Sequence, residues 1–292
     1  MPSVHTADRA YLSGVSDPSD SRTPLADGPV AAALAGRGVA WPVPSLRAST
    51  GSTNDDVLAL AAAGAPEGTC VVAEEQVAGR GRHGRVWESP VGAGLWCSVL
   101  VRAGDQPAER WALLSLAAGL AVVEALDVAC GVRAELKWPN DVVVIAAACG
   151  GGGGAGDGSL RKIGGILAQA GPDGTVVLGM GTNVSLLSAE LPVPTASSVL
   201  LEGGRTDRTA LLAALLAALE RRLAQWRTDE AALLADYRAQ CTTIGRLIEV
   251  DLPGGERLRG HVTGIDDGGR LLVSDGAKTT TVAAGDVVHA TI

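Results

Sequence analysis

Helix-like and strand-like patterns of apolar positions follow one another along the chain without a strict order. Apolar residues at helical spacing predict helices over 30–35, 57–63, 107–130, 209–226 and 229–239. Shorter apolar runs bounded by Gly, Pro and Asn predict strands over 70–74, 95–101, 134–138, 141–145, 163–170 and 175–180. Because helices and strands do not alternate as βαβ units, the sequence favours an α+β fold over a parallel α/β fold.

The 107–130 helix is apolar on most of its faces, so we expect it to pack across a sheet. Its most apolar part, residues 111–130, contains Glu124 and Asp127, which argues against a membrane span. No cationic start followed by an apolar core begins the chain, and the five cysteines are scattered without a C-x-x-C pair. We therefore expect a cytoplasmic protein without membrane association, disulfide framework or zinc site.

The pattern changes after Cys241, which indicates a second, smaller domain. Four short β-like runs, separated by turn-forming pairs such as Asp-Gly and Gly-Gly, follow at 246–250, 258–265, 270–273 and 279–282. This predicts a small β-barrel over 241–292 beside a larger domain over 30–240. Residues 1–29 lack periodicity and predict a flexible leader, and residues 146–159, with five consecutive glycines, predict a surface insertion.

Composition limits the classes of partner. The 292 residues are 47% hydrophobic and 19% charged, which allows a packed core, and the formal net charge is −8. An acidic protein lacks the basic face that bulk nucleic-acid binding needs, so any contact with a polyanion must be local. Lysine occurs only at 137, 162 and 278 among 24 cationic residues. Either these positions need a compact ammonium group, or they reflect compositional drift.

The Gly79–Arg85 segment is the sharpest candidate site. Its three glycines allow successive backbone N–H groups to turn toward one anion, and its three arginines add charge-assisted hydrogen bonds. A solvated, flexible Arg/Gly loop is the alternative. The segment also satisfies G-x-G-x-x-G, but Val86–Pro90 leads back to a strand instead of opening a helix. This disfavours dinucleotide binding and a nicotinamide-dependent oxidoreductase.

Three further segments combine cations, amides or carboxylates with glycine or proline. Lys137–Asp141 presents a cation, an amide and a carboxylate around a proline; its Asp and Asn oxygens suit Mg²⁺, and an ordinary turn is the alternative. Lys162–Leu167 places a cation before paired glycines, which let a ligand approach the backbone closely. Gly179–Val184 brings glycines beside Asn183, and a plain β-turn is its alternative.

Isolated polar and aromatic residues complete the candidates. Ser52, Thr53 and Asn54 are either pocket residues or a helix cap, and Gln76 is either a ligand-binding or a satisfied loop amide. Trp87 is either core or a stacking surface for a purine.

Taken together and in this order, these segments resemble the biotin–protein ligases, of the type without an N-terminal DNA-binding domain. The resemblance spans about residues 46–292. It implies a mixed sheet with helices, related to class II aminoacyl-tRNA synthetases, and a C-terminal SH3-like domain. It also implies that biotin and ATP form biotinyl-5′-AMP and pyrophosphate with Mg²⁺, and that biotin then passes to a lysine of a carboxylase carrier domain.

The resemblance also implies residue roles. Catalysis would rest on Arg82, Lys137 and Lys162. The biotin site would comprise Ser52, Thr53, Asn54, Gln76, Arg80, Gly81, Arg82, Lys162, Gly164 and Gly165. The ATP site would comprise Arg82, Arg85, Trp87, Lys137, Asn140 and Asn183, and Asp141 would lie near Mg²⁺.

Two related functions remain as alternatives. A lipoate or octanoyl ligase would share the catalytic fold. A biotin-responsive repressor would need a DNA-reading helix, whereas residues 1–29 carry few cations and no patterned helix, so we expect no nucleic-acid partner. The sequence leaves the oligomeric state open.

Overall fold

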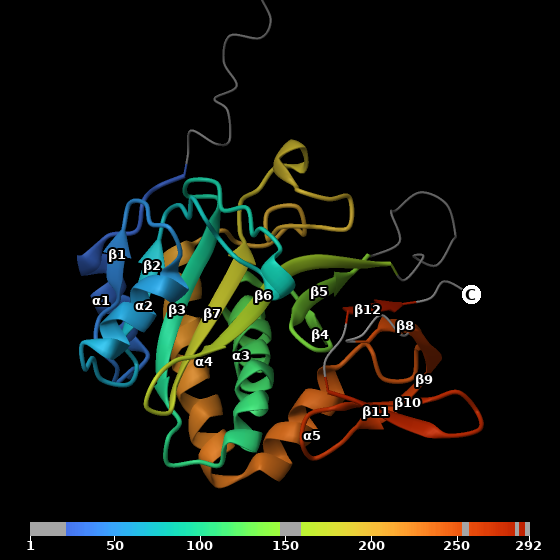
Figure 1. Ribbon diagram of the computed structural model, residues 1–292. Coiled ribbons are helices and arrows are strands. Elements are labelled where there is room, and N and C mark those ends of the chain that lie inside the picture. Colours follow the sequence, from blue (N-terminus) through green and yellow to red (C-terminus); the bar gives the residue numbers. More distant parts are fainter. Residues whose placement is uncertain (1–21, 147–158, 253–256, 284–285, 290–292) are drawn as a thin grey trace, which may run out of the picture.

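The computed structural model describes residues 22–146, 159–252, 257–283 and 286–289. Two sheets organise these residues (Figure 1). The larger sheet has seven strands in the order β1-β2-β3-β7-β6-β5-β4, and only its β1–β2 pair is parallel. Its strands are β1 (Ser45–Arg47), β2 (Cys70–Ala73), β3 (Gly94–Arg102), β4 (Glu135–Lys137), β5 (Asp141–Ile145), β6 (Leu160–Ala170) and β7 (Thr175–Asn183). The mixed sheet confirms the expected α+β class.

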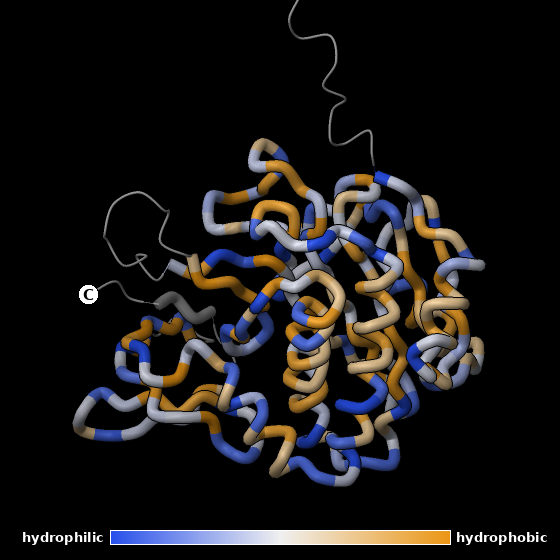
Figure 2. The backbone as a smooth tube through the Cα atoms, turned by 180° about the vertical axis from the view of Figure 1, so that it is seen from behind, coloured by the Kyte–Doolittle hydropathy of each residue, from blue (hydrophilic) through white to orange (hydrophobic). Residues whose placement is uncertain are grey.

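Helices cover both faces of this sheet because its central strands are apolar on both sides. On β3, Leu95, Val99 and their same-face neighbours pack with α3 (Ala112–Ala125) and α4 (Arg208–Thr228). On the other face Leu100 packs with α2 (Thr53–Ala62). Seen from behind in Figure 2, apolar segments line these central layers and hydrophilic segments follow the outer turns. The sheet and its helices together hold the main core.

The predicted 107–130 helix is a core element that the structure divides into three parts. A 3₁₀ turn (Ala108–Trp111) leads into α3, and a π turn (Leu126–Cys130) ends at Gly131, whose φ of 73° favours glycine. By length and composition the stretch resembles a membrane span, but 11 of the 14 residues of α3 are buried against the sheet and α4. The predicted core role is confirmed.

The C-terminal sheet has five antiparallel strands in the order β11-β10-β9-β8-β12. The four predicted strands are present as β8 (Leu247–Asp251), β9 (Arg257–Ile265), β10 (Leu271–Ser274) and β11 (Thr279–Val282). β12 (Asp286–His289), which pairs with β8, was not predicted. The helix α5 (Glu230–Gln240) connects this sheet to the larger domain.

The two domains meet at Trp138, in the turn between β4 and β5. The backbone N–H of Trp138 donates to Thr243 Oγ1 at 3.0 Å, and its indole Nε1 donates to the carbonyl of Gly269 at 2.9 Å. Thr242 N donates to the carbonyl of Leu136 at 2.8 Å. The C-terminal domain therefore holds the turn that contains Lys137–Asp141.

The N-terminal part departs from expectation. Residues 1–21 of the predicted flexible leader, and residues 147–158 of the predicted insertion, lie outside the described part. Residues 22–25, however, contact the larger domain: Arg22 pairs with Glu190, and the backbone of Thr23 and Leu25 hydrogen-bonds to Arg208 and Glu74. The helix α1 (Asp27–Gly36) also begins inside the predicted leader. The prediction of flexibility is wrong for these residues because buried polar contacts, which their composition does not reveal, hold them.

Candidate functional site

One pocket of about 470 Å³ brings together segments that are far apart in the sequence. It lies where β3 begins and β7 ends, between the start of α2, the Gly79–Arg85 loop and the Lys137–Asp141 turn. Its size and its mix of polar and aromatic side chains suit a small-molecule site. It is lined by these predicted residues: Ser52, Thr53, Asn54, Gln76, Arg80, Gly81, Arg82, Arg85, Trp87, Lys137, Asn140, Asp141, Lys162, Gly165 and Asn183.

Gly164 is a predicted site residue that does not line this pocket. A Cβ at this position would approach the Gly181 carbonyl oxygen to 2.9 Å, so Gly164 allows β6 and β7 to lie close together. Its place is therefore structural support beneath the site.

The start of α2 supplies a buried polar floor. Ser52 occupies the N-cap position, but its side chain makes no capping hydrogen bond, so the helix-cap interpretation does not explain it. Thr53 donates from its backbone N to Gln76 Oε1 at 2.9 Å, and its Oγ1 lies 2.6 Å from Ser98 Oγ. Ser98 Oγ in turn donates to Asn54 Oδ1 at 2.6 Å. This network fixes several donors and acceptors on one side of the pocket.

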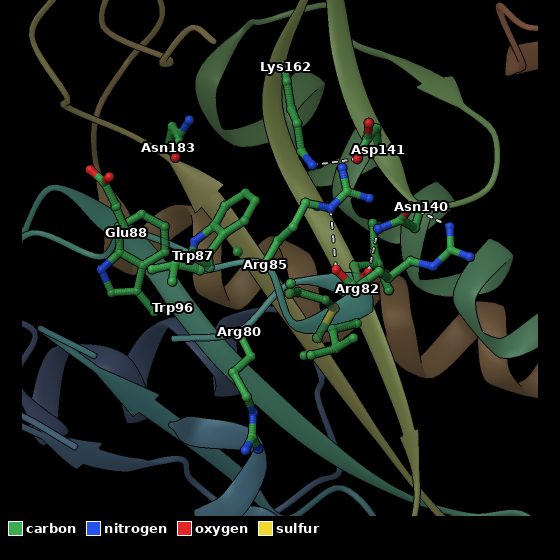
Figure 3. A pocket seen from close by; sticks show the side chains of 18 of the residues that line it. Arg80, Arg82, Arg85, Trp87, Glu88, Trp96, Asn140, Asp141, Lys162 and Asn183 are labelled. Atoms are coloured by element: carbon green, nitrogen blue, oxygen red, sulfur yellow. Dashed lines mark hydrogen bonds and ion pairs between the residues drawn. The ribbon is translucent and has the colours of Figure 1, made fainter. Parts of the chain in front are cut away.

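The Gly79–Arg85 loop is a tight hairpin, closed by Trp87 N donating to the Gly79 carbonyl at 2.9 Å. Its side chains do not converge on one point. Arg80 turns toward α2 and pairs with Asp55, whereas Arg82 Nη1 reaches Asn140 Oδ1 at 3.3 Å on the other side (Figure 3). The loop therefore supplies cations in two directions, and Arg82 contacts the Lys137–Asp141 turn.

Lys162 and Asp141 form an ion pair across the β5–β6 ladder (Figure 3). Lys162 Nζ lies 2.5 Å from Asp141 Oδ1 and 5.2 Å from the centroid of the Trp87 ring. The carboxylate and the indole face thus hold the ammonium group at the pocket wall.

The donor set for Mg²⁺ is small. Across the described ranges no three His, Cys, Asp or Glu side chains gather into a metal cluster. A Mg²⁺ ion bound together with phosphates needs only one or two protein carboxylates, and the carboxylates of Glu88 and Asp141 line the pocket.

Trp87 lies against two glycines of the sheet. A Cβ at Gly181 would come within 2.8 Å of the indole, and one at Gly165 within 3.1 Å. Trp96 meets the Trp87 ring edge-on, with centroids 6.3 Å apart. The glycines of β6 and β7 thus make room for an aromatic wall. Asn183 beside it donates through Nδ2 to the Ser197 carbonyl at 2.9 Å, which commits one of its two amide N–H donors to the neighbouring loop.

Several pocket residues escaped sequence reasoning. Leu186, Pro192 and Val193 line the pocket from a loop with no motif. Ser98, a single hydroxyl inside an apolar strand, lies behind the pocket and holds Thr53 and Asn54. Cys97 also lines the pocket, and burial raises the pKa of its thiol to about 12. A thiol with so high a pKa stays protonated and is no nucleophile at neutral pH.

Comparison with known proteins assigns the family. Residues 47–183 match the Biotin/lipoate A/B protein ligase family, and residues 243–290 match the Biotin protein ligase C terminal domain. The chain is 43% identical over 273 residues to the biotin--[acetyl-CoA-carboxylase] ligase of Mycobacterium tuberculosis. The alignment covers 92% of this chain and 97% of that protein. The chain belongs to the biotin protein ligase family.

Other family members agree over less of the chain. The bifunctional ligase/repressor BirA of Bacillus subtilis is 31% identical over 246 residues, with 81% of this chain and 70% of BirA covered. The biotin protein ligase of Aquifex aeolicus, solved with biotin and ATP, superimposes with a TM-score of 0.71 at 23% identity, over 85% of this chain and 99% of that one. This structural likeness shows that both domains have the fold of biotin protein ligases.

Proposed function

We propose that this chain is a biotin–protein ligase. It joins the biotin carboxylate to the α-phosphate of ATP, releases pyrophosphate, and transfers the biotinyl group to a lysine of a carboxylase carrier domain. The observation that carries the proposal is a single pocket with a neutral polar floor, a cationic middle and an aromatic end, in a chain 43% identical to a biotin--[acetyl-CoA-carboxylase] ligase. Each part matches one part of the two substrates.

The polar floor suits the ureido ring of biotin. That ring offers two N–H donors and one carbonyl acceptor, and Ser52, Thr53, Asn54 and Gln76 present hydroxyl and amide groups that complement both kinds. Because the network through Ser98 holds these groups in place, little side-chain freedom is lost on binding. We place the biotin ring here.

The cations lie where two anions must meet. The biotin carboxylate attacks the α-phosphate, and the repulsion between them is the obstacle to the first step. Arg82, Lys137 and Lys162 line the pocket beside the floor and neutralise this charge, and the backbone at Gly81 adds to them. Asp141 holds the Lys162 ammonium group in place. No nucleophilic side chain is needed, because the carboxylate itself attacks.

The aromatic end suits the nucleotide. We place adenine near Trp87 and Asn183 and the phosphates near Arg85 and Asn140, with Asp141 close to a Mg²⁺ ion that arrives with ATP. Mg²⁺ would offset phosphate charge during adenylate formation. The sequence places Arg80 in the biotin site. Its ion pair with Asp55 supports a second role, which is to hold the Gly79–Arg85 loop against α2.

The second step needs an amine from a partner and protection from water. The lysine of the carrier domain attacks the acyl carbon of the adenylate, an amide bond forms, and AMP leaves. The Gly79–Arg85 loop over the pocket would exclude water from the mixed anhydride. We expect this activity in the cytoplasm, where acyl-CoA carboxylases with carrier domains would be the partners.

Labelling of a purified carrier domain tests the proposal. With biotin, ATP and Mg²⁺, we expect one biotinyl group per carrier domain and biotin-dependent exchange of pyrophosphate into ATP. Lys162→Ala should remove the exchange. Lipoate in the same assay separates the related lipoate ligase: exchange with lipoate and none with biotin would contradict the proposal.

A further inference from the structure

Arg22 makes four polar contacts with a loop that is more than 160 residues away in the sequence. Its Nη1 donates to Glu190 Oε1 at 3.0 Å, and its Nη2 donates to Glu190 Oε2 at 2.5 Å. Its Nη2 also donates to the Ser185 carbonyl at 2.9 Å, and its Nε donates to Ser185 Oγ at 3.2 Å. The Arg22 side chain is only 9% exposed, so its bidentate ion pair with Glu190 is shielded from solvent, unlike an ordinary surface ion pair.

The loop that Arg22 grips forms one wall of the pocket. Leu186, Pro192 and Val193 line the pocket on either side of the 3₁₀ turn Ser188–Glu190. Glu190 also accepts a hydrogen bond from the backbone N–H of Leu187 at 2.8 Å. The carboxylate that binds Arg22 therefore also shapes the backbone next to the first wall residue.

At its far end the same loop joins the catalytic strand β6. Lys162 N donates to the Thr195 carbonyl at 2.7 Å, and Ser197 N donates to the Lys162 carbonyl at 2.8 Å. Asn183 adds its hydrogen bond to the Ser197 carbonyl. The loop from 185 to 197 is thus held at Arg22 on one side and at Lys162 on the other, with the wall residues between.

The segment that carries Arg22 is itself anchored by buried charge. Arg208 at the start of α4 pairs with Glu74 at 2.7 Å, with side chains 6% and 13% exposed, and donates to the Thr23 carbonyl at 2.7 Å. Glu74 accepts from Leu25 N at 2.8 Å. Removing one member of a buried ionic network leaves its partner unsatisfied, so the position of residues 22–25 is strongly determined.

We propose that Arg22 is a positioning residue for the nucleotide end of the active site. It acts through Glu190, because the Arg22–Glu190 ion pair fixes the position of the 185–197 loop. In that position the apolar residues of the loop, together with Trp87 and Asn183, enclose the nucleotide. The inference rests on the proposed function, because it takes the nucleotide to lie beside this wall. Residues 22–25, which lie outside the segments that carry the family's motifs, therefore support the active site.

Separate KM values for ATP and biotin test this role. We expect Arg22→Met in the full chain to raise the KM for ATP about tenfold, with the KM for biotin changed less than twofold. Glu190→Gln breaks the same grip from the other side and should shift the KM for ATP in the same direction. In the Arg22→Met, Glu190→Gln double variant, the change should be clearly less than the product of the two single changes.

Arg227→Met is the matched control. Arg227 pairs with Glu67 beside Arg102, at the end of the β3–β7 pair opposite the pocket. It should leave both KM values unchanged even if it lowers the melting temperature. Equal rises of both KM values in Arg22→Met, or a result matching Arg227→Met, would overturn the inference. Should Arg22→Met fail to fold, an unchanged KM for ATP in Glu190→Gln would overturn it equally. Failure of the unaltered protein to form adenylate would instead contradict the proposed function.

Discussion

The surroundings of single residues decide which of the charged and nucleophilic groups in this pocket take part in chemistry. Lys162 is held by Asp141 and lies over Trp87, so a rare lysine is set at the point where anions are expected to meet. Cys97 is also a pocket residue, but burial keeps its thiol protonated. Arg82 and Arg80, two positions apart, turn to different partners. Residue type suggested a role for each arginine, and the contact made by each one separates those roles.

Replacing Arg82 should weaken retention of the adenylate. Arg82→Gly removes the charge-assisted contact that we propose between Arg82, which lies beside the Lys137–Asp141 turn, and the adenylate, a loss of about 1.5–3 kcal/mol. Released adenylate would then acylate exposed amines of unrelated proteins. Arg82→Ala should behave alike, which excludes added glycine flexibility as the cause, and Arg259→Ala in the C-terminal domain is the control. The measurement is the rate of adenylate release, and a rate equal to that of the unaltered protein would contradict the role of Arg82.

Alkaline pH should destabilise the protein through its buried thiols. Burial raises the pKa of Cys70 well above its usual value and that of Cys97 to about 12. Because these folded-state values exceed the unfolded value near 8.5, the folded state holds more protons at high pH. The stability that these protonated thiols contribute is fully present below their unfolded-state pKa. It is lost as the pH rises from that pKa toward the folded-state pKa.

The melting temperature measures this loss. It should fall steadily from pH 8 to pH 10.5, and Cys70→Ala should show a shallower fall. A melting temperature that does not change over this range would contradict the assignment.

Among the elements, the glycines of β6 and β7 have the clearest function. In a strand interior glycine is unfavourable, yet Gly165 and Gly181 lie where a Cβ would strike the Trp87 indole. These elements were predictable from local apolar runs, and β2, β3, β6 and β7 were found close to their predicted bounds. The short β1 and the last strand β12 were not, because their few residues carry little periodicity and their pairing partners stabilise them.

Gly181→Ala should move the indole and disturb the nucleotide end of the pocket. The added methyl group would lie 2.8 Å from the Trp87 ring, and overpacking of this kind costs about 1–3 kcal/mol. We expect the KM for ATP to rise about tenfold, because misplacement of a binding surface reduces productive geometry. Gly264→Ala is the matched control, since it also lies in a strand but its Cβ would meet nothing closer than 4.0 Å. Equal KM values in the two variants would argue against the Trp87 wall.

In the whole molecule, Trp138 connects the C-terminal domain to the pocket of the larger domain. The residue stands between Lys137 and Asn140, and its indole hydrogen-bonds to Gly269 in the C-terminal domain. The small sheet thus supports the candidate site without lining the main pocket. The N-terminal segment does the same from the other side through Arg22 and Glu190. Elements at both ends of the described chain therefore hold parts of one pocket.

Trp138→Phe should reduce both stability and activity. It leaves the Gly269 carbonyl without its indole donor, a loss of about 1 kcal/mol, and loosens the turn that carries Lys137 and Asn140. Trp226→Phe is a matched control: its Nε1 donates to the Arg110 carbonyl at 3.0 Å, and Trp226 does not line the pocket. Both variants should melt earlier, but only Trp138→Phe should lower the rate of adenylate formation. Equal rates in both would show that the domain contact does not serve the site.

The chemistry of this protein follows from short segments that can be read without a structure. Glycines beside arginines, a Lys-Trp-Pro-Asn-Asp turn and the isolated Lys162 predict an anion-binding pocket, because each signal depends on residues that are neighbours in the chain. Folding alone brings Ser98 into the polar floor, turns Arg80 to Asp55, and joins Arg22 to Glu190 across 168 positions. Such contacts form between side chains whose separation carries no periodicity, so they depend on how the strands and helices pack and not on any local pattern.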